Sequence, residues 1–298
     1  MDARVGRLTL FAASTLTPES LYLQPRTIPL NTVEDNMELG LAGKVAIVTG
    51  GSKGIGRATA LKLLAEGGSV TVCARGKEAL AETVAAAGDN RGRIEPVAAD
   101  LTRLEDVKRV VARCVERFGR IDILVNNAGS ARAGNFLELP DDLWIEDFTL
   151  KMFGYVRMTR EVLLRMRDQK GGGVIVNIIG GAALTPSGGY TVGGAINAGV
   201  NHFTKSVAQE AAKYGVRVVG INPGPILTER LLKLRGAMEP GSASESQDEA
   251  FRKMTPLGRV GKPEEVADLV LFLASERGSF IHATNVTIDG GSHKGLMG

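Results

Sequence analysis

The chain has 298 residues, 44% of them apolar, and its 36 Lys and Arg against 33 Asp and Glu leave a formal charge of +3. This length and apolar content are enough for one large domain with a substantial buried core. A charge so slight and so dispersed argues against a nucleic-acid or membrane partner, and no run of about 18 apolar residues is present to span a bilayer.

The first 36 residues differ from the rest of the chain. They contain Pro18, Pro25 and Pro29, and they show no sustained helical or alternating pattern. Two early arginines ahead of a short apolar run faintly resemble a signal peptide, but the acidic residues nearby argue against a targeting sequence. We therefore predict a flexible N-terminal extension over residues 1–36 and a single domain over 37–298.

From Lys44 onward, short β-branched runs alternate with longer amphipathic stretches. Strands are predicted near 44–49, 69–74, 93–98, 121–126, 173–179, 216–221 and 284–288. Helices are predicted near 55–66, 77–87, 103–118, 140–168, 188–213 and 263–274. This alternation predicts an α/β fold, a single doubly wound (Rossmann) domain whose seven-stranded parallel sheet carries helices on both faces.

The first predicted strand runs directly into a glycine-rich turn and a helix. The turn reads Gly50-Gly-Ser-Lys-Gly-Ile-Gly56. Glycines there permit a tight turn and a close approach of the backbone to a pyrophosphate, and the helix amino terminus offers unpaired N–H donors. We expect the phosphates of a dinucleotide to be bound by Gly50, Ser52, Lys53, Gly54, Ile55 and Gly56.

The spacing Gly-x-x-x-Gly-x-Gly resembles that of the short-chain dehydrogenase/reductase family. Further motifs that resemble the family follow along the chain: Asp100-Leu101, Asn126-Asn-Ala-Gly129, Tyr190 in a long helix, Asn222-Pro-Gly-Pro225 with Thr228, and Asp289-Gly-Gly291. The resemblance implies that Asp100 and Leu101 contact the adenine of a nicotinamide cofactor. It also implies that Asn127, Ala128 and Gly129 line the cofactor and that Pro223, Gly224, Ile226 and Thr228 hold its carboxamide. Asn126 and Asn127 could also satisfy backbone groups at a strand end, and both roles can hold at once.

The choice of cofactor depends on the end of the second strand. A carboxylate there would bind the ribose hydroxyls of NAD, but the strand ends in Arg75. Lys53 in the glycine turn is a second cation, and charge-assisted bonds from both could hold a 2′-phosphate. We expect NADP(H) rather than NAD(H), unless both residues are ordinary solvated surface charges.

The catalytic positions depart from the family pattern of Asn, Ser, Tyr and Lys. Alignment with the family places Lys151 at the Asn position, and Ile179, Gly180 or Gly181 at the Ser position. Tyr190 is present, but Gly194 stands four residues later, where the family has its Lys. A tyrosine in water has a pKa of about 10, so the missing cation bears directly on acid–base chemistry near neutrality.

Lys151 offers a compensation for the missing lysine. By the family resemblance its side chain starts beside the site, so its ammonium could replace the cation lost at Gly194. Alternatively, Lys151 turns outward or packs its stem against neighbours. No good replacement for the serine is evident, since Thr185 and Ser187 lie in a Pro-Ser-Gly-Gly stretch that is typical of a turn.

Apolar residues follow the carboxamide motif, within a segment at about 227–256 that we interpret as a substrate lid. Its composition favours an apolar or ring-containing carbonyl or secondary alcohol substrate, although the same residues could pack helices. We expect an NADP(H)-dependent oxidoreductase in which Tyr190 and Lys151 are the catalytic residues. The alternative is a cofactor-binding homologue without redox turnover, acting as a binding or regulatory subunit. The long helices near 140–168 and 188–213 suggest a homo-oligomer, a tetramer or dimer.

The remaining potential ligands give no metal pattern. Cys73 and Cys114 lie in apolar segments far apart, and the three histidines lack Cys or carboxylate partners at metal-ligand spacing. We expect reduced core thiols, no metal site and a cytoplasmic location.

Overall fold

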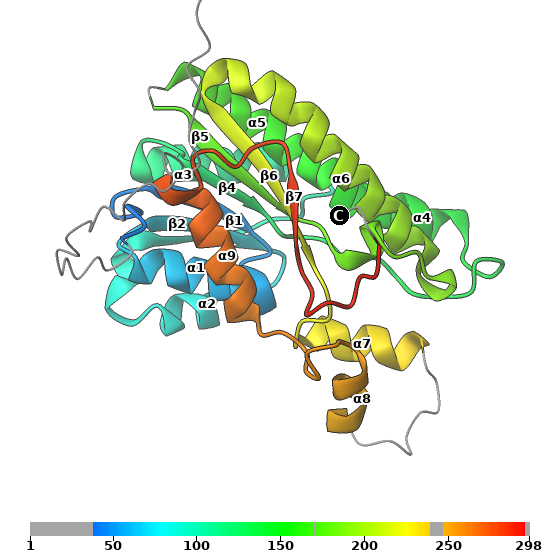
Figure 1. Ribbon diagram of the computed structural model, residues 1–298. Coiled ribbons are helices and arrows are strands. Elements are labelled where there is room, and N and C mark those ends of the chain that lie inside the picture. Colours follow the sequence, from blue (N-terminus) through cyan, green and yellow to red (C-terminus); the bar gives the residue numbers. More distant parts are fainter. Residues whose placement is uncertain (1–37, 170, 239–246, 296–298) are drawn as a thin grey trace, which may run out of the picture. The chain divides into compact units, whose positions relative to one another are not determined.

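The computed structural model describes residues 38–169, 171–238 and 247–295 (Figure 1). One compact unit begins at Leu39. The extension predicted over residues 1–36 and the middle of the predicted lid, residues 239–246, lie outside the described residues.

Seven parallel strands form one sheet in the order β3-β2-β1-β4-β5-β6-β7. The strands are β1 (Val45–Thr49), β2 (Ser69–Ala74), β3 (Ile94–Ala98), β4 (Ile123–Asn126), β5 (Gly173–Ile178), β6 (Val216–Pro223) and β7 (Asn285–Ile288). The central strands are buried on both faces, which explains their nearly continuous β-branched sequences. The predicted doubly wound parallel sheet is therefore confirmed.

Helices cover both faces of this sheet (Figure 1). One face is covered by α1 (Gly54–Ala65), α2 (Lys77–Ala86) and α9 (Pro263–Ala274), and the other by α3 (Leu104–Phe118), α5 (Gly154–Asp168) and α6 (Thr191–Ala211). Each layer has its own apolar core. Leu63 and Val270 belong to the first core, and Val110 and Val162 to the second.

The prediction of one regular helix over 140–168 was wrong, because a π-helical turn interrupts it. The structure has α4 (Asp141–Phe148), a π-helical turn at Thr149–Phe153, and then α5. The wider turn carries the buried side chain of Lys151. Such single π turns frequently occur at functional sites.

The segment between β6 and α9 contains two further helices. They are α7 (Glu229–Met238) and α8 (Gln247–Lys253), on either side of the residues that are not described. Figure 1 shows both helices away from the sheet, past the end of the long β6 strand. The predicted lid therefore contains regular structure, and its role as a lid stays a prediction.

Both cysteines are buried free thiols. Burial raises the pKa of Cys73 to about 12 and that of Cys114 to about 11. Neither thiol is a nucleophile near neutral pH, since reactivity requires the thiolate. Within the described part of the chain, no helix is long and apolar enough to cross a bilayer, and no cluster of potential metal ligands is found.

Candidate functional site

The glycine turn forms a cradle in which side chains have no room. Gly50 and Gly54 have φ values of +66° and +52°, which favour glycine. A Cβ on Gly56 would lie 2.3 Å from the carbonyl oxygen of Gly50. Helix α1 starts here, and its N-cap residue Lys53 makes no side-chain capping bond, so the first-turn N–H groups remain available. This arrangement fits the phosphates of a dinucleotide.

The end of β4 is joined to the end of β1 by a set of hydrogen bonds that we call the Thr49 clamp. The hydroxyl of Thr49 accepts from the backbone N–H groups of Asn127 (2.8 Å) and Ala128 (2.9 Å). The Asn127 side chain donates in return to the carbonyl oxygens of Thr49 and Gly50. Asn127 therefore satisfies backbone groups at the strand end, as one of its two interpretations required.

The carboxamide motif also lies next to the glycine turn. A Cβ on Gly54 would be 3.1 Å from the methyl group of Thr228, which follows β6. Beyond β3, the Asp100 carboxylate accepts hydrogen bonds from the backbone and hydroxyl of Thr102. The remaining predicted cofactor residues lie at or just beyond the carboxyl ends of their strands: Ser52, Ile55, Arg75, Leu101, Gly129, Pro223, Gly224 and Ile226. Parallel strands thus bring the whole predicted cofactor set to one edge of the sheet.

The two cations expected at a 2′-phosphate have different environments. The ammonium of Lys53 forms an ion pair with Glu229 of α7, with Nζ 2.9 Å from Oε2. Arg75 is exposed directly after β2, and it makes no hydrogen bond or ion pair with any residue that the structure describes. Lys53 thus already has a partner, while the Arg75 guanidinium is the unpaired one.

Tyr190 lies at the start of α6 with 6% of its surface exposed. Its ring packs so closely on Gly193 that a Cβ there would lie 2.0 Å from Cζ. Its hydroxyl accepts a hydrogen bond of 2.8 Å from Nη2 of Arg230 in α7. Nη1 of the same guanidinium donates to the carbonyl oxygen of Gly129, at 2.6 Å. Sequence reasoning missed Arg230; its only signal was a cation two residues beyond Thr228.

Lys151 turns inward, as the compensation hypothesis required, with only 4% of its surface exposed. Its amine donates to the carbonyl oxygen of Ile179 and, over 2.7 Å, to Oδ1 of Asn197. A Cβ on Gly129 would be 2.8 Å from the Lys151 stem, so only glycine leaves room for this side chain. Burial lowers the pKa of Lys151 well below its ordinary value, and the nearby charge of Arg230 lowers it further.

Other polar candidates have structural partners. Asn177 takes part in a buried network in which Asn126 donates to Thr159 and Asn177, and Asn177 donates to Thr204. The hydroxyl of Thr185 lies 2.9 Å from Nδ1 of His293. Ser187 is exposed, and its carbonyl oxygen accepts a hydrogen bond from the backbone N–H of Tyr190, at 3.0 Å.

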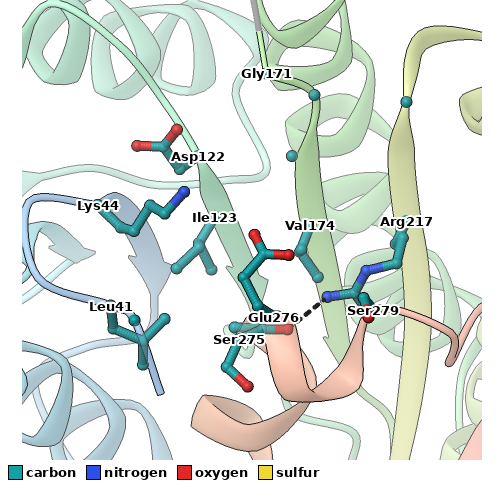
Figure 2. Close-up of a pocket in the computed structure, with 15 residues that line it drawn as sticks. Leu41, Lys44, Asp122, Ile123, Gly171, Val174, Arg217, Ser275, Glu276 and Ser279 are labelled. Atoms are coloured by element: carbon teal, nitrogen blue, oxygen red, sulfur yellow. Dashed lines mark hydrogen bonds between the residues drawn. The ribbon is translucent and has the colours of Figure 1, made fainter. Parts of the chain in front are cut away.

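A separate pocket of about 310 Å³ lies at the opposite edge of the sheet. Figure 2 shows Lys44, Asp122 and Arg217 around it, beside the amino ends of the central strands. The Asp122 carboxylate accepts from the backbone of Val45 and the Arg217 guanidinium donates to backbone carbonyls, so both have structural partners. None of the predicted site residues lines this pocket, which separates it from the chemistry around Tyr190.

The chain is similar in sequence to known dehydrogenases and reductases. Residues 44–239 match the family model described as short chain dehydrogenase. The 3-oxoacyl-(acyl-carrier-protein) reductase FabG of Thermotoga maritima is 36% identical over 251 residues, which cover 84% of this chain and 98% of that protein. The NAD-dependent glycerol dehydrogenase of Listeria innocua is 35% identical, over 85% of this chain and 95% of that protein.

Solved structures show the same similarity. The L-sorbose reductase of Gluconobacter frateurii, in complex with NADPH and L-sorbose, superposes with a TM-score of 0.81 at 33% identity. The match covers 87% of this chain and 100% of that one. Since the family model spans most of the domain and the relatives match over nearly their whole length, the chain belongs to the short-chain dehydrogenase family, and it is an oxidoreductase that acts on alcohol and carbonyl groups.

Proposed function

We propose that the protein is an NADP(H)-dependent oxidoreductase that interconverts a carbonyl compound and a secondary alcohol. The observation that carries this proposal is the position of Tyr190. Its buried hydroxyl is hydrogen bonded to the same guanidinium that binds the carbonyl of Gly129, at the sheet edge that holds the glycine cradle. A proton donor and a dinucleotide site at one edge are what hydride transfer to a carbonyl requires.

When bound, the nicotinamide supplies or accepts the hydride. The glycine cradle and the first turn of α1 bind the phosphates, and Asp100 and Leu101 contact the adenine. The residues at and beyond the carboxyl ends of β4 and β6 would hold the nicotinamide half: Asn127, Ala128, Gly129, Pro223, Gly224, Ile226 and Thr228. Tyr190 donates its hydroxyl proton to the carbonyl oxygen during reduction and accepts it during oxidation.

We propose that Lys151 supports this site as a hydrogen-bond donor rather than as a permanent cation. Its amine links the end of β5 to α6 through Ile179 and Asn197. Since burial disfavours its charged form, the amine is suited to holding these two elements in place beside Tyr190. The charge that the family obtains from its lysine must then come from another group.

The preference for NADP(H) over NAD(H) is supported by the end of β2. No carboxylate stands directly after this strand, and the exposed Arg75 guanidinium is free of protein partners within the described residues. An arginine can meet a phosphate with two parallel donors. The L-sorbose reductase, which is similar to this chain, is in complex with NADPH.

The substrate is proposed to be apolar or ring-containing, with α7 and α8 as its lid. Leu234 of α7 packs in the same apolar cluster as Tyr190 and Ile179, and Leu227 and Leu232 are 44% exposed on the same segment. An apolar surface directly beside the proton donor favours a substrate with little charge. We also propose a cytoplasmic enzyme, which the two reduced thiols support.

The activity itself is tested with Tyr190→Phe. We expect the purified protein to oxidise NADPH with a panel of apolar and cyclic ketones, and the variant to lose about 100-fold or more of the rate while still binding NADPH in calorimetry. Tyr214→Phe, in the exposed 3₁₀ turn that follows α6, is the matched control. NADPH binding without turnover, unaffected by Tyr190→Phe, would instead indicate a cofactor-binding subunit.

The cofactor preference is tested with Arg75→Ala. Loss of a charge-assisted bond to the 2′-phosphate should weaken NADPH binding by about 10-fold to 100-fold and leave NADH binding unchanged. Calorimetry with both cofactors measures this, and Arg160→Ala on α5 removes an equivalent exposed charge far from β2. Equal weakening of both cofactors would contradict the proposed role.

The buried amine predicts a pH dependence of stability. Because the pKa of Lys151 is lowered in the folded protein, the unfolded chain binds its proton more tightly. The folded state is therefore penalised at neutral pH, and the penalty disappears as the pH rises toward about 10.4, the value in an unfolded chain. Denaturant unfolding of wild type and Lys151→Met should give a free-energy difference that shifts in favour of wild type with rising pH. A difference as flat as that for the exposed Lys205→Met would refute it.

Assembly into a homo-oligomer, a tetramer or dimer, is supported by exposed apolar side chains on the helices of one face. Ile145 is 62%, Phe153 50% and Leu164 42% exposed. Light scattering should give a multiple of 31.5 kDa, and Phe153→Glu with Leu164→Glu should lower it. A wild-type mass of one chain would end this proposal.

A further inference from the structure

The group in contact with the Tyr190 hydroxyl is an arginine from a different part of the chain. Arg230 lies 40 residues beyond Tyr190, in the first turn of α7, and its Nη2 is 2.8 Å from the phenolic oxygen. Nη1 of the same guanidinium is anchored on the carbonyl oxygen of Gly129, at 2.6 Å. The two N–H donors of the rigid guanidinium thus hold the positive charge of Arg230 against the Tyr190 hydroxyl.

No other cation among the described residues is hydrogen bonded to this hydroxyl. The lysine of the family pattern is absent, because Gly194 stands there. The Lys151 amine is engaged with Ile179 and Asn197, and burial favours its neutral form. An arginine side chain, by contrast, stays protonated in proteins. Arg230 is therefore the permanent cation in contact with the Tyr190 hydroxyl, while burial and the nearby charge of Arg230 both lower the pKa of Lys151.

We propose that Arg230 is a catalytic residue whose guanidinium replaces the missing lysine and stabilises the phenolate form of Tyr190. This inference rests on the proposed function. In reduction, the carbonyl carbon gains a hydride from the reduced nicotinamide and the carbonyl oxygen gains the Tyr190 proton, which leaves a phenolate beside Arg230 that solvent reprotonates. In oxidation, the same phenolate takes the proton of the alcohol while the hydride passes to the oxidised nicotinamide.

The role predicts that loss of Arg230 harms oxidation more than reduction. Oxidation requires the phenolate before the reaction starts, whereas reduction starts from the neutral hydroxyl. An opposite charge in direct contact shifts an ionisation by about 1 to 3 pH units, so its removal should cost about 10-fold or more in kcat for oxidation at neutral pH. The KM for the alcohol should change much less.

The experiment compares Arg230→Gln, Arg230→Lys and the control Lys233→Gln, which removes an exposed charge of the same helix. The first readout needs no cofactor: tyrosinate formation on raising the pH, followed by ultraviolet difference spectra against Tyr190→Phe. The midpoint should rise by about one pH unit or more in Arg230→Gln. It should stay close to wild type in Arg230→Lys and in Lys233→Gln. An unchanged midpoint in Arg230→Gln would overturn the proposal.

A rescue variant separates loss of charge from loss of structure. A Cβ added at Gly194 would meet only the carbonyl oxygen of Ala182, at 3.6 Å, which is an ordinary contact, so a side chain can start at this position. When Gly194→Lys is combined with Arg230→Gln, the double variant should recover most of the oxidation rate, and its midpoint of tyrosinate formation should return toward the wild-type value. Failure of both to recover would count against the proposal. If no variant or wild type turns over any substrate while the spectroscopic midpoints still depend on Arg230, the proposed function fails and the pairing with Tyr190 stands.

Discussion

The hydroxyl of Thr49, which accepts two backbone N–H groups from the neighbouring strand end, is the contact on which the site depends. These hydrogen bonds hold the carboxyl ends of β1 and β4 side by side, and the Asn127 side chain then donates to the carbonyl oxygen of Gly50. Buried N–H groups must find acceptors, so the alternative to this clamp is a costly loss of two hydrogen bonds. The glycine cradle and the chain that leads to Gly129 are therefore held together by the Thr49 clamp.

Gly129 in turn connects the two basic side chains of the site. Its missing side chain leaves room for the stem of Lys151, and its carbonyl oxygen binds the guanidinium of Arg230. A residue with a Cβ at this position would displace Lys151 from its bonds to β5 and α6. Gly129 thus positions the amine of Lys151 through its missing Cβ and the guanidinium of Arg230 through its carbonyl oxygen.

Much of the fold was predictable from the sequence because its signals are local. Buried parallel strands are recognisable as β-branched runs, and a glycine turn of this kind binds phosphates only between a strand and a helix. Tyr190 was identified from its position in the family pattern, which offered the inward course of Lys151 only as one of two alternatives. The π turn at Thr149–Phe153 was not predictable, since nothing in its composition distinguishes it from an α-helix. Arg230 was missed because its partners, Tyr190 and Gly129, are 40 and 101 residues away, and only the folded chain brings them together.

The first turn of α7 is attached to the domain by two neighbouring residues, Glu229 and Arg230, whose contacts differ in exposure to solvent. The ion pair between Glu229 and Lys53 is exposed, whereas the hydrogen bond between Arg230 and Tyr190 is partly buried. Dissolved ions screen exposed charges far more than buried ones, with a Debye length of about 8 Å at physiological ionic strength. Rising ionic strength therefore weakens the ion pair between Glu229 and Lys53 first. The hydrogen bond between Arg230 and the Tyr190 hydroxyl is the contact that persists at high salt.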